Sequence, residues 1–301
     1  MAAEADFGAA WVGRKIGLRW TIGDVSDRGF EALRLSVWGA WRVFGPEAGY
    51  TIGLNTVPLA QARRRTGPLP DGVEWRVAEG RLPDFLRPHL DDGMAEGVAW
   101  KFDPLRIYPD RFEIALDNDC ILWRLPTAVA RWLDAAPSDV CLLAEDVRPA
   151  FGAFSDLCGP APRNTGIRGL PPGFDLGAAL RRALARNPVQ LVSELDEQGM
   201  QVAALSERPP FVVSVDEVTI CSPFHPHLPH LGTCGAHFVG QNVRCVPWDY
   251  YGRPGTEVLI EHWERQRPGL YERVGLDSGV NRTARAQPVG HRSQTFGARD
   301  G

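Results

Sequence analysis

The chain has 301 residues, of which 44% are hydrophobic and 23% charged, and a formal net charge of −4. That length suffices for one large domain or two small ones. No apolar run approaches the ~20 residues that span a bilayer, and the near-neutral charge argues against nucleic acid as a partner. The acidic N-terminus lacks a signal-peptide pattern, and the six cysteines form no Cys-x-x-Cys pair. We therefore expect a cytoplasmic protein with reduced thiols and no transmembrane segment.

The first half of the sequence alternates between strand-like and helix-like segments. The apolar run at 15–24 ends at Gly-Asp, and Ser26 is placed to cap a helix with apolar residues at helical spacing as far as Phe44. Residues 80–100 combine Gly, Pro and paired acids, which predicts a loop with a helical turn. Further strands are predicted at 50–55, 73–79, 111–116 and 140–145, and helices after Pro58 and at 126–135.

The second half of the sequence is more irregular. Helices are predicted at 174–187, about 196–206 and 256–266, and short strands at 210–215 and 217–221. The segment 235–240 is predicted to be a further short strand or a loop. From about residue 275 large apolar residues are almost absent, which predicts a disordered tail at 275–301. The overall alternation indicates an α/β sheet that is covered by helices.

Two carboxylates follow the predicted strand at 111–116. Asp117 and Asp119 flank Asn118 at its end, and ligands of open α/β sheets bind beyond the carboxyl ends of strands. Two carboxylates one residue apart can share a hard divalent cation, which in turn can bridge the phosphates of a nucleotide. A polar turn between strands is the alternative, because Asp and Asn are common turn residues.

Two further segments carry residues suited to such a ligand. His237, in "GAHFVG", offers an imidazole that suits Mn²⁺ beside carboxylates; a histidine packed in the core is the alternative. Asn164, in "RNTGIRG", could bind sugar hydroxyls, and Gly166 would allow a close approach of the backbone to a ligand. A loop that leads into a strand is the alternative for this second segment.

Acidic and basic residues elsewhere complete the set of candidates. Asp196, Glu197 and Gln198 lie near a predicted helix start, where acids favour the helix dipole without any further role. If this helix start lies at a sugar site, a carboxylate of Asp196 or Glu197 and the amide of Gln198 could contact the substrate. Lys101 is one of only two lysines among 33 basic residues and precedes Asp117, so it is available to neutralise a diphosphate.

These motifs occur in one order along the chain: a lysine, Asp-x-Asp, Asn-Thr-Gly, Glu-Gln-Gly, and His-Phe-x-Gly with a later Pro-Trp. From about residue 16 to 250, this order resembles the retaining, nucleotide-sugar-dependent glycosyltransferases of family 8, which include glycogenin and bacterial lipooligosaccharide galactosyltransferases. The resemblance implies one Rossmann-like domain of the glycosyltransferase A type over 1–274, with a mixed, mostly parallel sheet flanked by helices. It also implies transfer of a sugar from a nucleotide sugar, with retention of the anomeric configuration. The expected donor is UDP-linked, and the expected acceptor is a hydroxyl group of a glycan, a lipid-linked molecule or a small molecule.

The resemblance also assigns roles to individual residues. Asp117, Asp119 and His237 match the ligands of Mn²⁺ or Mg²⁺. Either Glu197 or Asp196, together with Gln198, matches the acid–glutamine pair at the reaction centre. The residues that match donor contacts or the closing C-terminal loop are Lys101, Asn164, Gly166, Gly240 and Trp248. The ending "HFVGQNVRCVPW" is longer than the family pattern and lacks its lysine, for which Arg244 is a candidate substitute.

Other functions remain as alternatives. A metal-dependent nucleotidyltransferase or phosphohydrolase could use the same Asp-x-Asp pair, but neither explains the His-Gly-Pro-Trp segment. A non-catalytic sugar-binding relative is a further alternative. The segment "CSPFHPHLPHLGTC" could bind zinc through Cys221, His225, His227, His230 and Cys234, although its spacing fits no usual zinc finger. An extended loop over the acceptor site is the other interpretation of that segment.

Overall fold

A seven-stranded sheet forms the centre of the computed structural model, which describes residues 13–277 except 92, 94–97 and 136. The strand order is β3–β2–β1–β4–β7–β6–β8, and all strands run parallel except β7. The strands are β1 (Ile16–Ile22), β2 (Gly49–Leu54), β3 (Val73–Val77), β4 (Phe112–Leu116), β6 (Leu142–Glu145), β7 (Arg163–Leu170) and β8 (Phe211–Val213). This mixed, mostly parallel sheet confirms the predicted fold class.

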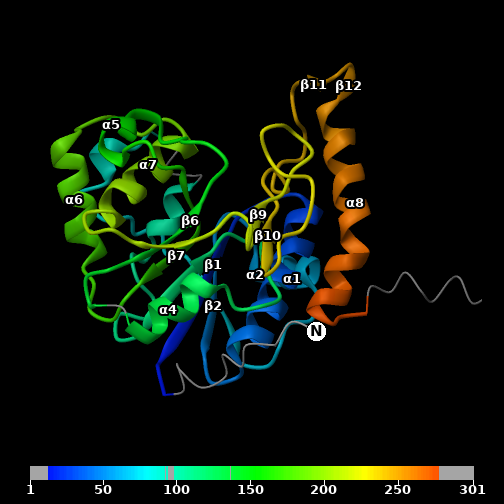
Figure 1. Ribbon diagram of the computed structural model, residues 1–301, viewed down its shortest axis with the longest axis horizontal. Coiled ribbons are helices and arrows are strands. Elements are labelled where there is room, and N and C mark those ends of the chain that lie inside the picture. Colours follow the sequence, from blue (N-terminus) through cyan, green and yellow to red (C-terminus); the bar gives the residue numbers. More distant parts are fainter. Residues whose placement is uncertain (1–12, 92, 94–97, 136, 278–301) are drawn as a thin grey trace, which may run out of the picture.

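Helices cover both faces of the sheet (Figure 1). One face packs against α1 (Asp27–Phe44), α2 (Leu59–Thr66) and α4 (Thr127–Ala135). The other packs against α6 (Leu176–Arg186) and α7 (Glu194–Leu205), next to which lie η3 (Gly152–Phe154) and the short α5 (Ser155–Cys158). The sheet therefore separates two hydrophobic cores.

Local sequence explains the first strand and helix. In β1 the apolar side chains of Leu18 and Trp20 alternate with residues that face the opposite side, so one face packs on α1. Ser26 caps α1 by accepting a hydrogen bond from the backbone N–H of Gly29 at 3.0 Å, as predicted. Phe30 and the other apolar residues of α1 then fill the core at helical spacing.

Charged residues lie within the other face of the sheet. Arg19, Glu113 and Arg168 are each at most 3% exposed. The Glu113 carboxylate accepts hydrogen bonds from the two backbone N–H groups of residues 107–108, and Arg19 donates to three carbonyl groups within 101–105. These bonds supply partners for charges that would otherwise be costly to bury.

A smaller sheet lies beside the large one. It consists of β5 (Cys120–Leu122), β10 (Gly235–His237) and β9 (Val218–Ile220), and β10 runs antiparallel to β5. The hairpin of β11 (Asp249–Tyr250) and β12 (Arg253–Pro254) leads into α8 (Gly255–Val274). The helix continues beyond the predicted end at 266 because its last turns bury Leu270, Tyr271 and Val274 against the small sheet and α1.

The segments at 163–170, 80–100 and 275–301 have different outcomes with respect to the sequence prediction. The Asn-Thr-Gly segment lies within strand β7 itself, so the alternative of a loop before a strand is wrong. The 80–100 region contains η1 (Arg87–His89) and the start of η2 (Val98–Phe102). Of the predicted tail, residues 278–301 lie outside the described residues.

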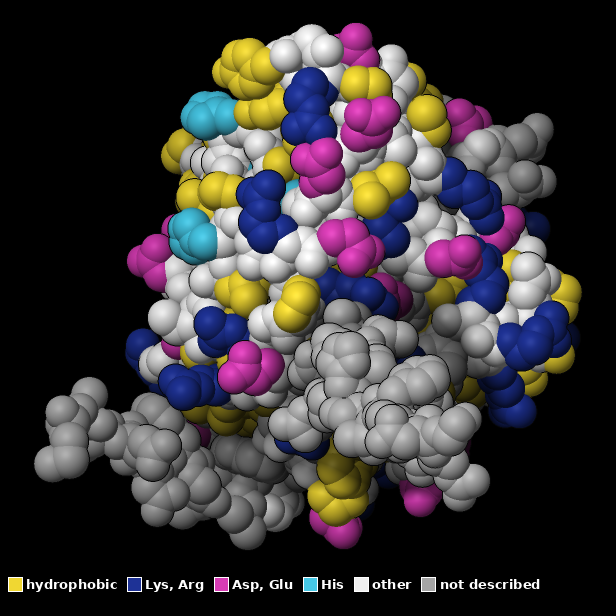
Figure 2. All heavy atoms as spheres, turned by 90° about the vertical axis from the view of Figure 1, so that its right-hand side faces the viewer, with side chains coloured by type: hydrophobic (Ala, Val, Ile, Leu, Met, Phe, Trp, Pro, Cys, Tyr) yellow, Lys and Arg dark blue, Asp and Glu magenta, His cyan; other side chains and the backbone are white. Residues whose placement is uncertain are grey.

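The surface on the α8 side carries both signs of charge. Figure 2 shows basic and acidic side chains interspersed there. On α8 itself, Glu261 pairs with Arg253 and Arg267 pairs with Glu31. Within the described part of the chain, no helix has the length and apolar character needed to cross a membrane.

Candidate metal and donor site

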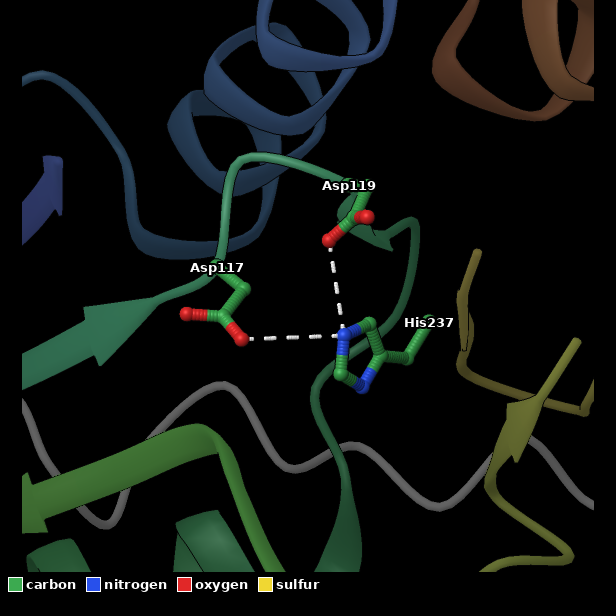
Figure 3. A group of neighbouring side chains, drawn as sticks. All are labelled: Asp117, Asp119 and His237. Carbon is green, nitrogen blue, oxygen red and sulfur yellow. Dashed lines mark ion pairs between the residues drawn. The ribbon is translucent and has the colours of Figure 1, made fainter. Parts of the chain in front are cut away.

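Asp117, Asp119 and His237 converge beyond the end of β4 (Figure 3). His237 Nε2 lies 3.4 Å from Asp119 Oδ1 and 3.7 Å from Asp117 Oδ2. One ligand atom from each residue can be chosen such that all three lie within 4.8 Å of one another. Two carboxylates and one imidazole form a donor set that suits Mn²⁺.

The junction between the two sheets creates this arrangement. The backbone N–H of Asp117 donates to Gly166 O on β7, at 2.9 Å, so the residue still continues the large sheet. The carbonyl of Asp119 accepts a hydrogen bond from Phe238 N at 2.8 Å, and His237 pairs with Cys120 in the small sheet. The Asp-x-Asp segment is therefore a turn between strands, and this turn presents both carboxylates to His237.

Gly166 provides the space that the His237 ring occupies. A Cβ atom on Gly166 would lie 2.4 Å from Cε1 and Nδ1 of His237. The sequence predicted a close approach at Gly166 to a ligand, whereas in the structure the histidine makes that approach.

Electrostatics keeps Asp117 ionised. Burial alone would raise the pKa of Asp117, but the Lys101 ammonium, 3.0 Å from Oδ1, and His237 lower it below its ordinary value. Burial would lower the pKa of His237, yet its hydrogen bond to Asp119 and the two carboxylate charges raise it. An ionised Asp117 is the form that binds cations.

Lys101 links this cluster to α7. Its Nζ atom lies 3.7 Å from Glu197 Oε2 as well as near Asp117. Burial raises the pKa of Glu197 even though Lys101 opposes that shift. The two carboxylates outweigh burial at Lys101 and raise its pKa, so the lysine is charged.

The first turn of α7 distinguishes the two candidate reaction-centre acids. Asp196 accepts hydrogen bonds from the backbone N–H groups of Ala153 and Val192, at 2.8 and 3.0 Å. Glu197 instead lines the central cleft, as does Gln198, whose amide donates to Ala150 O at 2.8 Å. Glu197, and not Asp196, is therefore a lining residue of the cleft.

A cleft of about 670 Å³ contains these groups, a volume typical of ligand sites. Of the predicted residues it is lined by Lys101, Asp117, Asp119, Glu197, Gln198, His237 and Gly240. The ends of β1 and β2 contribute Thr21, Gly23, Asp24, Asn55 and Thr56 to the same cleft. The carboxyl ends of β1, β2 and β4 therefore open into one space, at the point where the strand order changes direction between β1 and β4.

Three other residues named in the sequence analysis have different surroundings. Asn164 uses both polar atoms of its amide on backbone groups, Glu145 O at 2.8 Å and Gly166 N at 2.9 Å. Trp248 packs edge-on against Phe224, with ring centroids 4.6 Å apart. Arg244 pairs with Asp24 at 2.6 Å, beside the cleft.

Sequence reasoning did not single out several residues that the structure brings to the site. Arg168 and Gln201 form a buried chain of hydrogen bonds that ends on the Glu197 carboxylate. Asp146 and Arg148 line the cleft together with His227, which belongs to the Cys/His loop at 221–234. The position of Arg168 between the apolar residues Ile167 and Leu170 was the only signal that could have indicated it.

The Cys/His loop does not gather its side chains around a common point. All six cysteines are free, and Cys221 contacts His262 of α8 at 3.4 Å. Among the described residues, Asp117, Asp119 and His237 form the only group of three or more metal-ligating side chains close enough to share an ion. No finding on this loop favours zinc.

Comparisons with known proteins establish the fold. No protein-family model matches the sequence, and no curated protein sequence matches it significantly. The galactosyltransferase LgtC in complex with donor and acceptor sugar analogues superposes with a TM-score of 0.51 at 11% identity, over 86% of this chain and 95% of LgtC. An active-site mutant of LgtC gives a TM-score of 0.50 at 10% identity, over 83% of this chain and 95% of that one.

A second glycosyltransferase structure superposes on this chain to a similar extent. The bifunctional glycosyltransferase WbbM superposes with a TM-score of 0.50 at 14% identity, over 87% of this chain and 52% of WbbM. The chain therefore has the glycosyltransferase A-type fold, which confirms the fold that the motif order implied.

Proposed function

We propose that the protein is a metal-dependent glycosyltransferase that moves a sugar from a nucleotide sugar, UDP-linked by preference, to a hydroxyl acceptor. The observation that carries this proposal is the convergence of Asp117, Asp119 and His237 inside a large cleft at the switch point of a glycosyltransferase A-type fold. The similar LgtC structure is described as a complex with donor and acceptor sugar analogues.

The residues present fit Mn²⁺ or Mg²⁺. The carboxylates of Asp117 and Asp119 lie on the cleft wall with the imidazole of His237, and the lowered pKa of Asp117 keeps it ready to bind. When bound there, the cation would offset negative charge on the leaving diphosphate.

The remaining residues bind and orient the substrates. Transfer breaks the bond between the anomeric carbon and a diphosphate oxygen and forms a bond from that carbon to the acceptor oxygen. The acceptor proton passes to the departing phosphate oxygen or to Glu197. Lys101 supplies positive charge next to the diphosphate, and Glu197 and Gln198 face the sugar from α7. Positioning and charge stabilisation dominate such a mechanism.

Asp119→Ala provides the primary test. We expect the variant to lose Mn²⁺-dependent hydrolysis and transfer of nucleotide sugars by a factor of about 100 or more, since one ligand and one negative charge are removed. Asp139→Ala is the matched control because it removes an exposed carboxylate that pairs with Arg208 on the surface. An Asp119→Ala variant that retains the full metal-dependent rate would contradict the proposed site.

A screen of donors separates the proposed function from its alternatives. Nucleotide sugars, with Mn²⁺ present, should be consumed and should release a nucleoside diphosphate. Turnover of nucleoside triphosphates alone would instead support a nucleotidyltransferase or phosphohydrolase. The anomeric configuration of the product, read by NMR, tests retention.

A further inference from the structure

Asn118, the middle residue of the Asp-x-Asp segment, contacts a loop that lies far away in the sequence. Its amide Nδ2 donates to Asn242 Oδ1 at 2.7 Å, and Asn242 Nδ2 donates back to Asn118 Oδ1 at 3.1 Å. Asn118 is 4% exposed, and 124 residues separate the two partners. The buried amide of Asn118 and the half-buried amide of Asn242 therefore bond to each other reciprocally.

The first turn of α1 completes this contact as a third element. Asn118 Nδ2 also donates to Gly29 O at 3.1 Å. The backbone N–H of Ser26 donates to Asn242 O at 3.0 Å. A Cβ atom on Gly29 would lie 2.7 Å from Asn242 Oδ1, so the close approach of the loop depends on a glycine there.

The Asp-x-Asp turn, the loop and the segment that leads into α1 all contribute residues to the wall of the cleft. Asp117 and Asp119 flank Asn118, and the cleft is lined by Gly240 and Asn242 of the loop as well as by residues 23–25 before α1. Two side-chain hydrogen bonds therefore join the loop to the turn that holds both carboxylates.

We propose that Asn118 and Asn242 are a pair of positioning residues that lock the 239–242 loop to the Asp-x-Asp turn, so that cation binding and nucleotide binding depend on one shared contact. This inference rests on the proposed function, because it concerns how the same cation and nucleotide site is assembled. The amide at position 118 is specific, because a carboxylate in its place has no N–H to donate to Gly29 or Asn242.

Binding measurements on four proteins test the pair: wild type, Asn118→Ala, Asn242→Ala and the double variant. The probes are Mn²⁺ alone, followed by the EPR signal of the free ion, and UDP in the presence of Mn²⁺, followed by calorimetry. We expect Asn242→Ala to weaken Mn²⁺ binding about tenfold, which is the scale of the lost hydrogen bonds, although it removes no proposed cation ligand. The double variant should bind no more weakly than Asn118→Ala, because the two residues act as a unit.

Two further variants separate positioning from general destabilisation. Gln266→Ala removes one amide hydrogen bond, between α8 and Pro229. It should lower Tm about as much as Asn242→Ala does and leave the affinities for Mn²⁺ and UDP unchanged. Asn242→Asp retains the acceptor of the 2.7 Å bond and should recover part of the Mn²⁺ affinity that Asn242→Ala loses. Wild-type affinities in Asn242→Ala, or multiplicative effects in the double variant, would overturn the proposal.

Proteolysis tests the pair without reference to nucleotide binding. Arg244 is exposed and lies two residues after Asn242, so release of the loop should speed tryptic cleavage there in Asn242→Ala but not in Gln266→Ala. If wild-type protein bound neither Mn²⁺ nor UDP, the proposed function would fail, and the cleavage rates would still decide whether the two amides lock the loop. Equal cleavage of Asn242→Ala and wild type would refute the lock.

Discussion

His237 reaches the two carboxylates because Gly166 on β7 leaves room for its ring. The backbone of His237 pairs with Cys120 of β5, the residue after Asp119, and this pairing fixes where the imidazole lies. The site is therefore assembled from side chains that were identified in the sequence and from a close packing contact that was not.

Gly166→Ala should displace the His237 ring, since a Cβ atom 2.4 Å from two of its atoms cannot be accommodated without movement. We expect Mn²⁺ affinity to fall by about 10- to 100-fold, the range seen when the support of a metal ligand is removed. Gly269→Ala in α8 is the control, because its nearest neighbouring atom is 3.9 Å away. Unchanged Mn²⁺ binding in Gly166→Ala would argue against His237 as a ligand.

His262 gives the protein a specific dependence on pH. Burial lowers the pKa of this histidine from 6.5 to about 4, and its Nε2 lies 3.4 Å from Cys221 Sγ. Because the folded pKa is the lower one, the neutral residue contributes its stability fully above about pH 6.5, and this contribution is lost as the pH falls toward 4. His262→Leu should flatten the fall in Tm between pH 7 and pH 5 by a few degrees, as read by thermal denaturation. Parallel Tm profiles of the two proteins would contradict this assignment.

At the scale of elements, buried charges connect the large sheet to the segment that carries Lys101. Arg19 of β1 donates to the carbonyls of Lys101, Pro104 and Leu105, at 3.2, 2.8 and 3.3 Å, and lies 3.7 Å from Glu113 of β4. The two central strands thus fix η2 and the loop after it, and with them the lysine that faces Asp117.

Arg19→Met should destabilise the protein by about 3–5 kcal/mol, since it leaves Glu113 buried without its nearest cation on β1 and leaves three carbonyls without a donor. For a domain of this size that corresponds to a fall in Tm of roughly 10 °C. Arg14→Met is the control, because Arg14 makes one exposed hydrogen bond, to Asp134 O. The double variant Arg19→Met/Glu113→Gln should recover part of the loss; a double variant that is less stable than the single one would refute the pairing.

At the scale of the whole molecule, the sheet separates a purely apolar layer from a layer in which an apolar core is combined with buried charges. The layer against α1, α2 and α4 is built from aliphatic and aromatic residues. The opposite side combines an apolar core beneath α6 and α7 with the charged residues that lead to the cleft. Stability thus comes mainly from hydrophobic burial in both layers, while the chemistry gathers where strands of the two sheets end.

Ligands that bind only the folded protein should raise its melting temperature. UDP together with Mn²⁺ at about 100 times the Kd should stabilise the protein by ~2.7 kcal/mol, which corresponds to a rise in Tm of roughly 5–10 °C. Asp119→Ala should show a much smaller rise under the same conditions, and Asp139→Ala the full one. A rise in Tm that is equal in wild type and Asp119→Ala would place the ligand elsewhere.

The alternation of strands and helices and the capped start of α1 were predicted from sequence, because each depends on residues close together in the chain. A turn at Asp-x-Asp was the alternative to a cation site, and the structure has a turn there that presents both carboxylates to His237. The order of the motifs also implied the glycosyltransferase A-type fold, which the superpositions confirm. The antiparallel direction of β7 and the full length of α8 were not predicted, since neither has a local signal in the sequence.

The sequence by itself determined which residue types were available for cation and phosphate chemistry: Asp117, Asp119, His237, Lys101 and an acidic pair at the start of α7. Only the tertiary structure decided that Glu197, rather than Asp196, faces the cleft, because the Asp196 carboxylate is taken up by backbone N–H groups of a neighbouring segment. The same holds for the pairing of Asn118 with Asn242. Such contacts join residues far apart in the chain, and their geometry is fixed by how the two sheets pack and not by any local pattern.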